Sequence, residues 1–360
     1  MRLFLQRPSY GGRQKGAILL LAVICCALAL LSGVIGAGFA SGRELVRFFA
    51  IHGAMAGAAA VCALFTLYAL FLRLCTQMEK TGCSTLPMLC RARLGERTGR
   101  LCAALFFLLC AITGGVMLAA CAELGALMLP VRHAYGFTLT LTLMVCLPLS
   151  AHGLCALALP GALLTFMMPF LLLRLLALPM GEACFLPAMT PDLPVRAAAD
   201  GAAYGALNAA MLAAILPLLL TLDTSRRKRA VQLFALLFAL ILLPGILVCR
   251  RHLPAILDQP LPFVYLSREM GMGHMLVAAC MYAAAVSTLL AMLSALALMM
   301  PKAGKHMRTA LSGAVCLLFS LAGFTPLVHS GYPVLGALCM TLLILLCLPD
   351  QLFPRAVSGL

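Results

Sequence analysis

One glycine-rich stretch carries the residues whose types and spacing are best suited to binding chemistry. It runs from Gly36 to Glu44, reads GAGFASGRE and lies inside a long apolar segment. Each glycine lowers helix stability by about 1 kcal/mol relative to alanine, so we expect a helix to unwind here. Unwound backbone inside a membrane leaves amide and carbonyl groups that need partners. Freed N–H groups at the start of a half-helix suit a substrate carboxylate, and freed carbonyls suit a small cation.

Two other interpretations compete for this stretch. Gly38 and Gly42 are four residues apart, a spacing that also lets two helices pack closely, and this interpretation stays open. A dinucleotide-binding fingerprint is a poor match, because it requires Gly or Ala where Ser41 stands. It also requires a strand before the glycines, and the sequence has an apolar span there instead.

Ionisable residues inside apolar segments are costly and therefore indicate function. Glu123 lies deep in a predicted span, within AACAELG. It would carry a coupling proton or pair with a cationic substrate; a structural ion pair with Arg174 or Arg43, or a place near the outer interface, stays equally open. Glu44 and Arg47 follow the glycines, where they would gate the vestibule or form a solvated pair.

The composition places these residues in an all-α integral membrane protein. Of the 360 residues, 64% are hydrophobic and 10% are charged, with a mean hydropathy of +1.07. The long uncharged blocks suit helices of about 20 residues that cross a bilayer, and they lack the alternation of barrel strands. Ten spans are predicted at about residues 16–50 (interrupted), 54–74, 100–129, 134–150, 153–178, 199–222 (interrupted), 230–249, 272–300, 308–326 and 331–349.

The net charge of +15 does not indicate nucleic acid, because the basic residues cluster between the apolar blocks. Their bias toward the N-terminal tail and the loops after spans 2, 6 and 8 predicts that both termini are cytoplasmic. The 17 cysteines and the histidines show no metal-ligand spacing, and no nucleophile lies beside a base. We therefore expect no catalytic residues, no enzyme, no cofactor and no metal beyond a sodium site.

Ten spans suggest two inverted halves of five within one transporter domain, at about residues 1–178 and 179–360. In such a repeat, spans 1 and 6 correspond, and both are interrupted near the membrane centre. Span 1 contains the glycine-rich stretch, and span 6 has its glycines between Asp200 and Asn208. Paired interruptions of this kind are the best sequence indication of a transport site.

The sequence also resembles a known family, the YkvI-like bacterial membrane proteins. These are candidate permeases grouped with the amino acid–polyamine–organocation superfamily. The similar motifs are GAGFASGRE at 36–44 with FF at 48–49, YGALN at 204–208, ST at 287–288, and GF at 323–324 with YPVLG at 332–336. The resemblance covers nearly the whole chain, and its first motif is the specific one. It implies the leucine-transporter-type fold, with a solute bound between spans 1, 3, 6 and 8.

Within that fold, two pairs of polar side chains would serve the site. Tyr204 and Asn208 share a face of span 6 and would line the solute pocket, with helix–helix hydrogen bonding as the alternative. Ser287 and Thr288 would complete a sodium site with backbone carbonyls of span 1, because hard cations prefer oxygen ligands. The alternative is that both hydroxyls bond carbonyls of their own helix. The span 1 carbonyls are those near Ser32 and Ile35.

The resulting prediction is a secondary active transporter of a small, amino-acid-like solute in the cytoplasmic (inner) membrane of a bacterium. Alternating access would be coupled to sodium or protons, and the partners are the solute and the lipid bilayer, not nucleic acid. The alternatives are a receptor-like or structural membrane protein on the same scaffold, and a channel. The residues predicted to bind the substrate are Gly36, Ala37, Gly38, Phe39, Ser41, Gly42, Tyr204 and Asn208.

Overall fold

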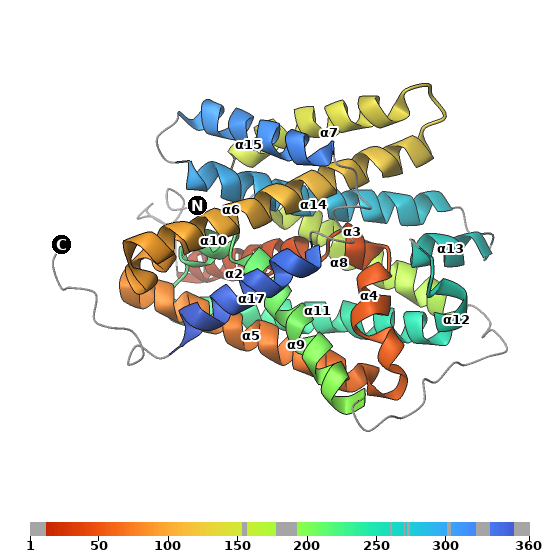
Figure 1. Ribbon diagram of the computed structural model, residues 1–360, viewed down its shortest axis with the longest axis horizontal. Coiled ribbons are helices and arrows are strands. Elements are labelled where there is room, and N and C mark those ends of the chain that lie inside the picture. Colours follow the sequence, from red (N-terminus) through yellow and green to blue (C-terminus); the bar gives the residue numbers. More distant parts are fainter. Residues whose placement is uncertain are drawn as a thin grey trace.

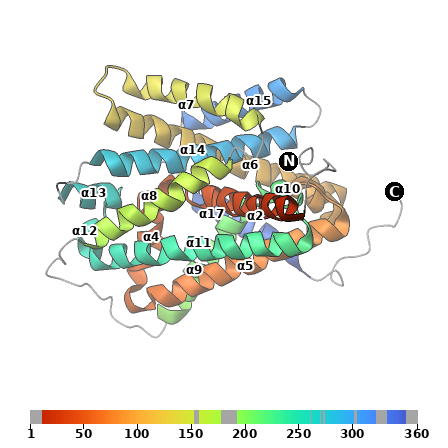
Figure 2. The ribbon, with the colours of Figure 1, turned by 180° about the vertical axis from the view of Figure 1, so that it is seen from behind.

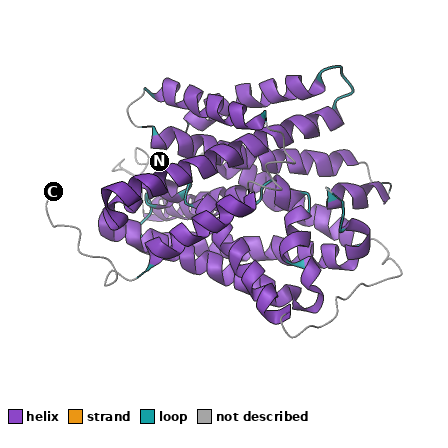
Figure 3. Cartoon of the chain, in the orientation of Figure 1, coloured by secondary structure: helices purple, strands orange, loops and turns teal. Residues whose placement is uncertain are grey.

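The computed structural model is helical, without strands, over the residues that it describes (Figures 1 and 3). These residues are 12–152, 157–177, 193–259, 261–269, 271, 274–300, 304–321 and 332–348. In chain order the helices are α2 (Gly12–Val34), α3 (Ala37–Ala40), α4 (Arg43–Phe48), η1 (Ala50–Met55), α5 (Ala56–Thr81), α6 (Leu86–Met128), α7 (Ala134–Ala151), α8 (Ala158–Leu176), α9 (Leu193–Leu212), α10 (Leu216–Leu219), α11 (Thr224–Arg251), α12 (Leu253–Ile256), α13 (Pro262–Glu269), α14 (His274–Met299), α15 (Lys305–Ser320) and α17 (Tyr332–Cys347).

Several of these helices have the length and composition of membrane spans. Within the described residues, six qualify: the continuous segment Ala50–Thr81 and helices α6, α7, α8, α11 and α14. Their outer faces are apolar, as Leu159 and Phe166 of α8 show with exposures of 80% and 79%. Side chains of this kind suit contact with lipid. The chain is therefore a multi-pass membrane protein.

The count of ten crossings stays a prediction. Each of the ten expected ranges contains a described helix, but α15 and α17 have only 16 residues each. Helix α6 is longer than expected because it includes a bend at Gly95, and the arm beyond the bend matches the predicted span. The basic N-terminal tail at 1–11 and the motif at 323–324 lie outside the described residues.

The helices form layers, with α2 and α3 near the middle (Figure 1). In this view α7 and α15 lie above α6 and α14, and α5, α9 and α11 lie on the opposite side of α2. Seen from behind, α2 lies between α8 and α11 (Figure 2) and packs against both. Leu30, Leu31 and Ile35 are fully buried. The glycine-rich stretch is thus held inside the bundle, where protein shields its backbone.

Helix 1, made of α2, α3 and α4, is interrupted at the predicted stretch. Helix α2 ends at Val34, and Gly36 is extended with φ −92° and ψ −176°. Gly42 has φ +84°, in the left-handed region that favours glycine. A β-carbon at Gly42 would also lie 2.9 Å from Cδ1 of Phe263 in α13, so space and conformation both require glycine there. The sequence prediction of an unwound segment is correct in place and cause.

The glycines of helix 6, made of α9 and α10, were wrongly interpreted as its interruption. Helix α9 continues through Gly201 and Gly205 up to Leu212. A β-carbon at Gly201 would collide with the carbonyl oxygen of Ala59, and one at Gly205 with that of Ala63. These glycines therefore allow α9 to pack closely on α5.

Helix 6 is instead interrupted at Ala213–Ile215, just before α10. The amides of Ala214 and Ile215 donate to carbonyls three residues back, which is turn geometry and not an α-helical ladder. Pro217 has no N–H to donate to Ala213, and its ring would clash with that carbonyl. The proline, not the glycines, was the signal for this interruption.

Two short helices between α11 and α14 were not predicted. Helices α12 and α13 each have a proline in their first turn, where a missing N–H costs little. Phe263 and Leu266 of α13 are buried, and the Phe263 amide donates to the carbonyl of Ser41 at 2.9 Å. This hydrogen bond holds α13 against the interruption of helix 1.

Candidate functional site

The interruptions of helices 1 and 6 adjoin. A β-carbon on Gly33, at the end of α2, would lie 2.5 Å from Cδ1 of Ile215 in the interruption of helix 6. One on Gly36 would lie 3.3 Å from Oγ1 of Thr288 in α14 and 3.7 Å from the sulfur of Met117 in α6. Helix 1 is therefore interrupted where helix 6, α6 and α14 meet. These are the spans 1, 6, 3 and 8 that were expected to surround the solute.

The predicted cation residues lie on the α14 side of this meeting point. The Ser287 hydroxyl is 3.0 Å from the carbonyl oxygen of Ser32 and 2.8 Å from that of Ala284 in its own helix. A hydroxyl has one proton and can donate fully to only one of them. The side-chain hydroxyls of Ser32 and Thr288 are buried and have no hydrogen-bond partner among the residues that the structure describes. Ile35 is buried and lies in the chain between the last residue of α2 and Gly36.

A second group of residues surrounds Gly38, further along helix 1. A β-carbon at Gly38 would collide with the Glu44 carboxylate, so this side chain turns back against the interruption. The Tyr204 hydroxyl donates to Oε2 of Glu44 at 3.3 Å. Tyr204 is buried, and its ring centroid lies 5.2 Å from that of Phe48 and 5.0 Å from that of Phe49. Two predicted binding residues and one predicted gating residue thus come together in one small site.

The outer half of the interruption is tied to the α12–α13 segment. The Ser41 hydroxyl donates to the Gly38 carbonyl at 2.9 Å and accepts from the Arg43 amide at 3.3 Å. The Arg43 guanidinium donates to the carbonyls of Leu257 and Gln259 at 2.9 and 3.0 Å. These bonds fix α4 relative to the segment that covers it.

Three predicted binding residues face other partners. The Phe39 ring lies 5.8 Å from that of Phe238 in α11, and Ala37 is buried among core residues. The Asn208 side-chain amide donates to the Tyr204 carbonyl at 2.9 Å within α9, which is a helix-internal bond. The small residues of the stretch shape the backbone, and Phe39 anchors it to α11.

The predicted Glu44–Arg47 pair does not form. Arg47 is exposed, and its guanidinium carbon lies 5.8 Å from the Phe48 ring centroid. Glu123 is also exposed, near the end of α6. It is six residues beyond Met117, and six residues turn an α-helix by about 240°, so Glu123 does not share the face that meets Gly36. Its coupling role stays a prediction without a contact at the interruption.

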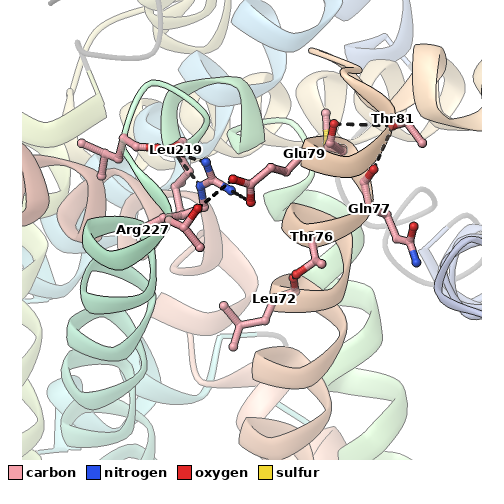
Figure 4. Close-up of polar contacts among 10 residues, drawn as sticks. Leu72, Thr76, Gln77, Glu79, Thr81, Leu219 and Arg227 are labelled. Carbon is pink, nitrogen blue, oxygen red and sulfur yellow. Dashed lines mark hydrogen bonds and ion pairs between the residues drawn. The ribbon is translucent and has the colours of Figure 1, made fainter.

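A polar cluster at one end of the molecule was only partly predicted (Figure 4). Glu79 of α5 and the buried Arg227 of α11 point toward one another and form an ion pair of 2.9 Å. Arg227 also donates to the carbonyls of Leu219 and Leu222, and Thr224 donates to Glu79 at 2.7 Å. The cluster thereby joins α5, α10 and α11. The sequence places Asp223 at the end of span 6 and predicts that it pairs with Arg226 or Arg227; in the structure it pairs with Arg226 at 2.9 Å.

At the other end of the molecule, the place of Asp200 near the start of span 6 predicts that it caps this helix, but the structure places it inside α9. Helix α9 begins at Leu193, and the Asp200 carboxylate lies 2.9 Å from Nε2 of the buried His52 in η1. Because His52 lies 148 positions before Asp200, a single sequence gives no indication that the two residues form a pair. Among the described residues, no group of three or more His, Cys, Asp or Glu is placed to hold a metal ion.

These features define an all-α, multi-pass membrane protein in which two interrupted helices meet inside the bundle. No family model matches the sequence, and no curated protein matches it. Membership of the YkvI-like family therefore stays a prediction.

Solved structures are similar to the chain. The substrate-bound, outward-open structure of a Na⁺-coupled sialic acid symporter has a TM-score of 0.58 and 13% identity, over 90% of this chain and 78% of that one. A histidine-to-alanine mutant of the Eremococcus coleocola manganese transporter has a TM-score of 0.53 and 15% identity, over 95% of this chain and 79% of that one. Both are transporters, not enzymes, of the leucine-transporter-type fold, and the likeness shows that fold for this chain.

Proposed function

We propose that this chain is a secondary active transporter that moves a small, amino-acid-like solute by alternating access. The observation that carries the proposal is the interruption of helix 1 between Val34 and Arg43, inside the bundle and against the interruption of helix 6. Non-helical backbone at membrane depth is tolerated only where protein or a water-filled site satisfies it. Paired interrupted helices are a recurring way to build a solute site in transporters.

The proposal includes the finer architecture expected from the sequence. Ten crossings would form two inverted halves, at about residues 1–178 and 179–360, in the inner membrane of a bacterium with both termini cytoplasmic. The resemblance in fold to a manganese transporter and a sialic acid symporter supports this arrangement. The solute and the surrounding lipid are the proposed partners.

Sodium is the coupling ion that the buried hydroxyls favour. Ser287 joins α14 to the Ser32 carbonyl, and the buried hydroxyls of Ser32 and Thr288 have no partner within the described part of the chain. Buried polar groups normally have a partner, and oxygen atoms of this kind suit a small hard cation. Protons are the alternative coupling ion.

Separate contacts close the two ends of the proposed path. Arg43 and Ser41 hold the α12–α13 segment over one end, and Arg227 and Glu79 join α5 to α10 and α11 at the other. These elements lie at opposite ends of the molecule in Figures 1 and 2. A small recess beside the interruption of helix 6, lined by Ala214 among others, lies on the Arg227 side. Alternating access requires that one set of contacts opens while the other holds.

Uptake into proteoliposomes tests the proposal. A mixture of radiolabelled amino acids is offered with an imposed sodium gradient, an imposed proton gradient or no gradient. We expect saturable accumulation that follows one of the gradients. Binding without accumulation under every gradient would favour the receptor-like or structural alternative, and conductance without saturation would favour a channel.

A further inference from the structure

Glu44 has an unusual environment for a carboxylate in helix 1. It is partly buried, lies against Gly38 and accepts one hydrogen bond from Tyr204. Within the part of the chain that the structure describes, no Arg, Lys or His side chain forms an ion pair with it. An ionised carboxylate inside a membrane protein requires a cation or several hydrogen bonds, because the surroundings solvate it poorly.

The two arginines nearest in sequence are engaged elsewhere. The guanidinium of Arg43 is held by the carbonyls of Leu257 and Gln259. The guanidinium of Arg47 is exposed and lies over the Phe48 ring. The chain therefore places two cations next to Glu44 in sequence and directs both away from its carboxylate.

A structural role alone does not account for this arrangement. An acidic residue in the first turn of α4 would stabilise the positive end of that helix. That role requires neither the absence of a side chain at Gly38 nor the hydroxyl of Tyr204. Both features direct the carboxylate back toward the interruption, where the proposed solute lies.

The aromatic residues beside the carboxylate add a second attraction for a cation. The Tyr204 ring contacts the rings of both Phe48 and Phe49, and its hydroxyl donates to one oxygen of Glu44. Aromatic ring faces attract ammonium groups, most strongly where water is excluded. A carboxylate next to such rings suits a protonated amine better than a second carboxylate, which it would repel.

We propose that Glu44 binds the protonated amine of the transported solute, with Tyr204, Phe48 and Phe49 forming the wall of this subsite. The inference rests on the proposed function and narrows it. The solute must carry a free amine, and its carboxylate is dispensable for recognition at this subsite.

The contributions of the amine and the carboxylate to binding can be tested separately. The amide of an amino acid lacks the carboxylate charge, and its N-acetyl derivative lacks the amine charge. The full-length purified chain is titrated by calorimetry and thermal shift with alanine, leucine, phenylalanine and lysine, with their amides, and with their N-acetyl derivatives. We expect that each amino acid that binds in its free form also binds as its amide. No N-acetyl derivative should bind. Glu44→Gln should weaken the amine-bearing forms by about ten- to a hundredfold, the range for a hydrogen bond to a charged group.

Matched variants guard against a folding defect. Glu96→Gln makes the same chemical change at an exposed residue that pairs with Arg100, and it should bind like the parent. Glu44→Asp keeps the charge and should keep the preference for a free amine, with weaker affinity. Size-exclusion profiles show whether each variant is folded.

The outcomes distinguish this inference from the proposed function. If an N-acetyl derivative binds as tightly as its free amino acid, or folded Glu44→Gln binds unchanged, the amine subsite is wrong even when gradient-driven uptake persists. Absence of binding by every compound would also overturn it. Amine-dependent binding through Glu44 without accumulation in proteoliposomes would support the subsite and contradict transport.

Discussion

Gly38 and Glu44 can only be understood together. The carboxylate occupies the space that a side chain at position 38 would need, so the glycine here makes room for a functional group. Gly42 serves a different purpose, because its left-handed backbone allows the chain to turn into α4. The same residue type therefore has two physical roles within one short stretch.

Gly38→Leu should leave the protein inserted in the membrane and abolish solute binding. The leucine side chain would displace the Glu44 carboxylate and fill the interruption. Binding of the amino acid mixture, measured by scintillation proximity, should fall more than about tenfold, the loss expected when a charged contact is removed.

The matched control for this change is Gly57→Leu. Gly57 lies near the start of α5, and a β-carbon there would meet nothing within 4 Å. The Gly57→Leu variant should bind the amino acid mixture as tightly as the parent protein. Unchanged binding in Gly38→Leu would mean that the glycines serve only helix packing.

Thr288→Val tests the proposed sodium site. Without sodium, the variant should be at least as stable as the parent, because it removes a buried hydroxyl that bonds none of the described residues. Added sodium should stabilise the parent by about 2.7 kcal/mol at a hundredfold excess over Kd, which raises its melting temperature. The melting temperature of the variant should not change.

Thr309→Val is the control for Thr288→Val, because the Thr309 hydroxyl is also buried but bonds Lys305 of its own helix. It should keep the sodium response of the parent. Equal sodium-dependent shifts in all three proteins would exclude Thr288 as a ligand.

The backbone conformation of the glycine-rich stretch was predictable from the sequence. The interruption around Gly36 and Gly42 follows from glycine's weak helix propensity, and the structure has it at that place. The contact of the Phe39 ring with Phe238 was not predictable, because the direction of this side chain depends on how α3 packs against α11. No local pattern contains that information.

At the scale of elements, helix 6 shows that glycines in a helix can indicate either close packing or an interruption. Its glycines allow close packing on α5, and Pro217 causes the interruption that the glycines were expected to cause. The prediction that helix 6 is interrupted was right, but its position was wrong. Glycine periodicity alone cannot separate packing from unwinding, whereas a proline beyond the first turn of a helix removes one of its backbone hydrogen bonds.

Glu79→Gln should loosen the end of the molecule at which α5, α10 and α11 meet. The change weakens the contact with Arg227, which normally joins α5 to the turn after α10. A cysteine placed at Ala214, beside the recess, in a cysteine-free background should then react severalfold faster with a hydrophilic maleimide.

Glu96→Gln in the same background provides the comparison, since its partner Arg100 is exposed. Its labelling rate should match that of the parent. An unchanged rate in Glu79→Gln would mean that the Glu79–Arg227 pair does not control access to this recess.

At the scale of the whole molecule, the apolar blocks were sufficient to predict a helical membrane protein, and the resemblance to a known family implied its leucine-transporter-type fold. The contacts that join distant segments were not predictable. His52 with Asp200, and Glu79 with Arg227, are each separated by 148 positions. The docking of α13 on Ser41 likewise depends on the assembled bundle. Such pairs are set by packing, and a single sequence does not record them.

Hydrogen–deuterium exchange of the chain in lipid nanodiscs tests the central claim most directly. Peptides covering residues 35–42 should exchange much faster than those from Leu28–Val34, and a saturating amino acid mixture with sodium should slow that exchange. Protection throughout residues 28–42, equal with and without the mixture, would contradict the account, because it would show a continuous helix with no solute beside it.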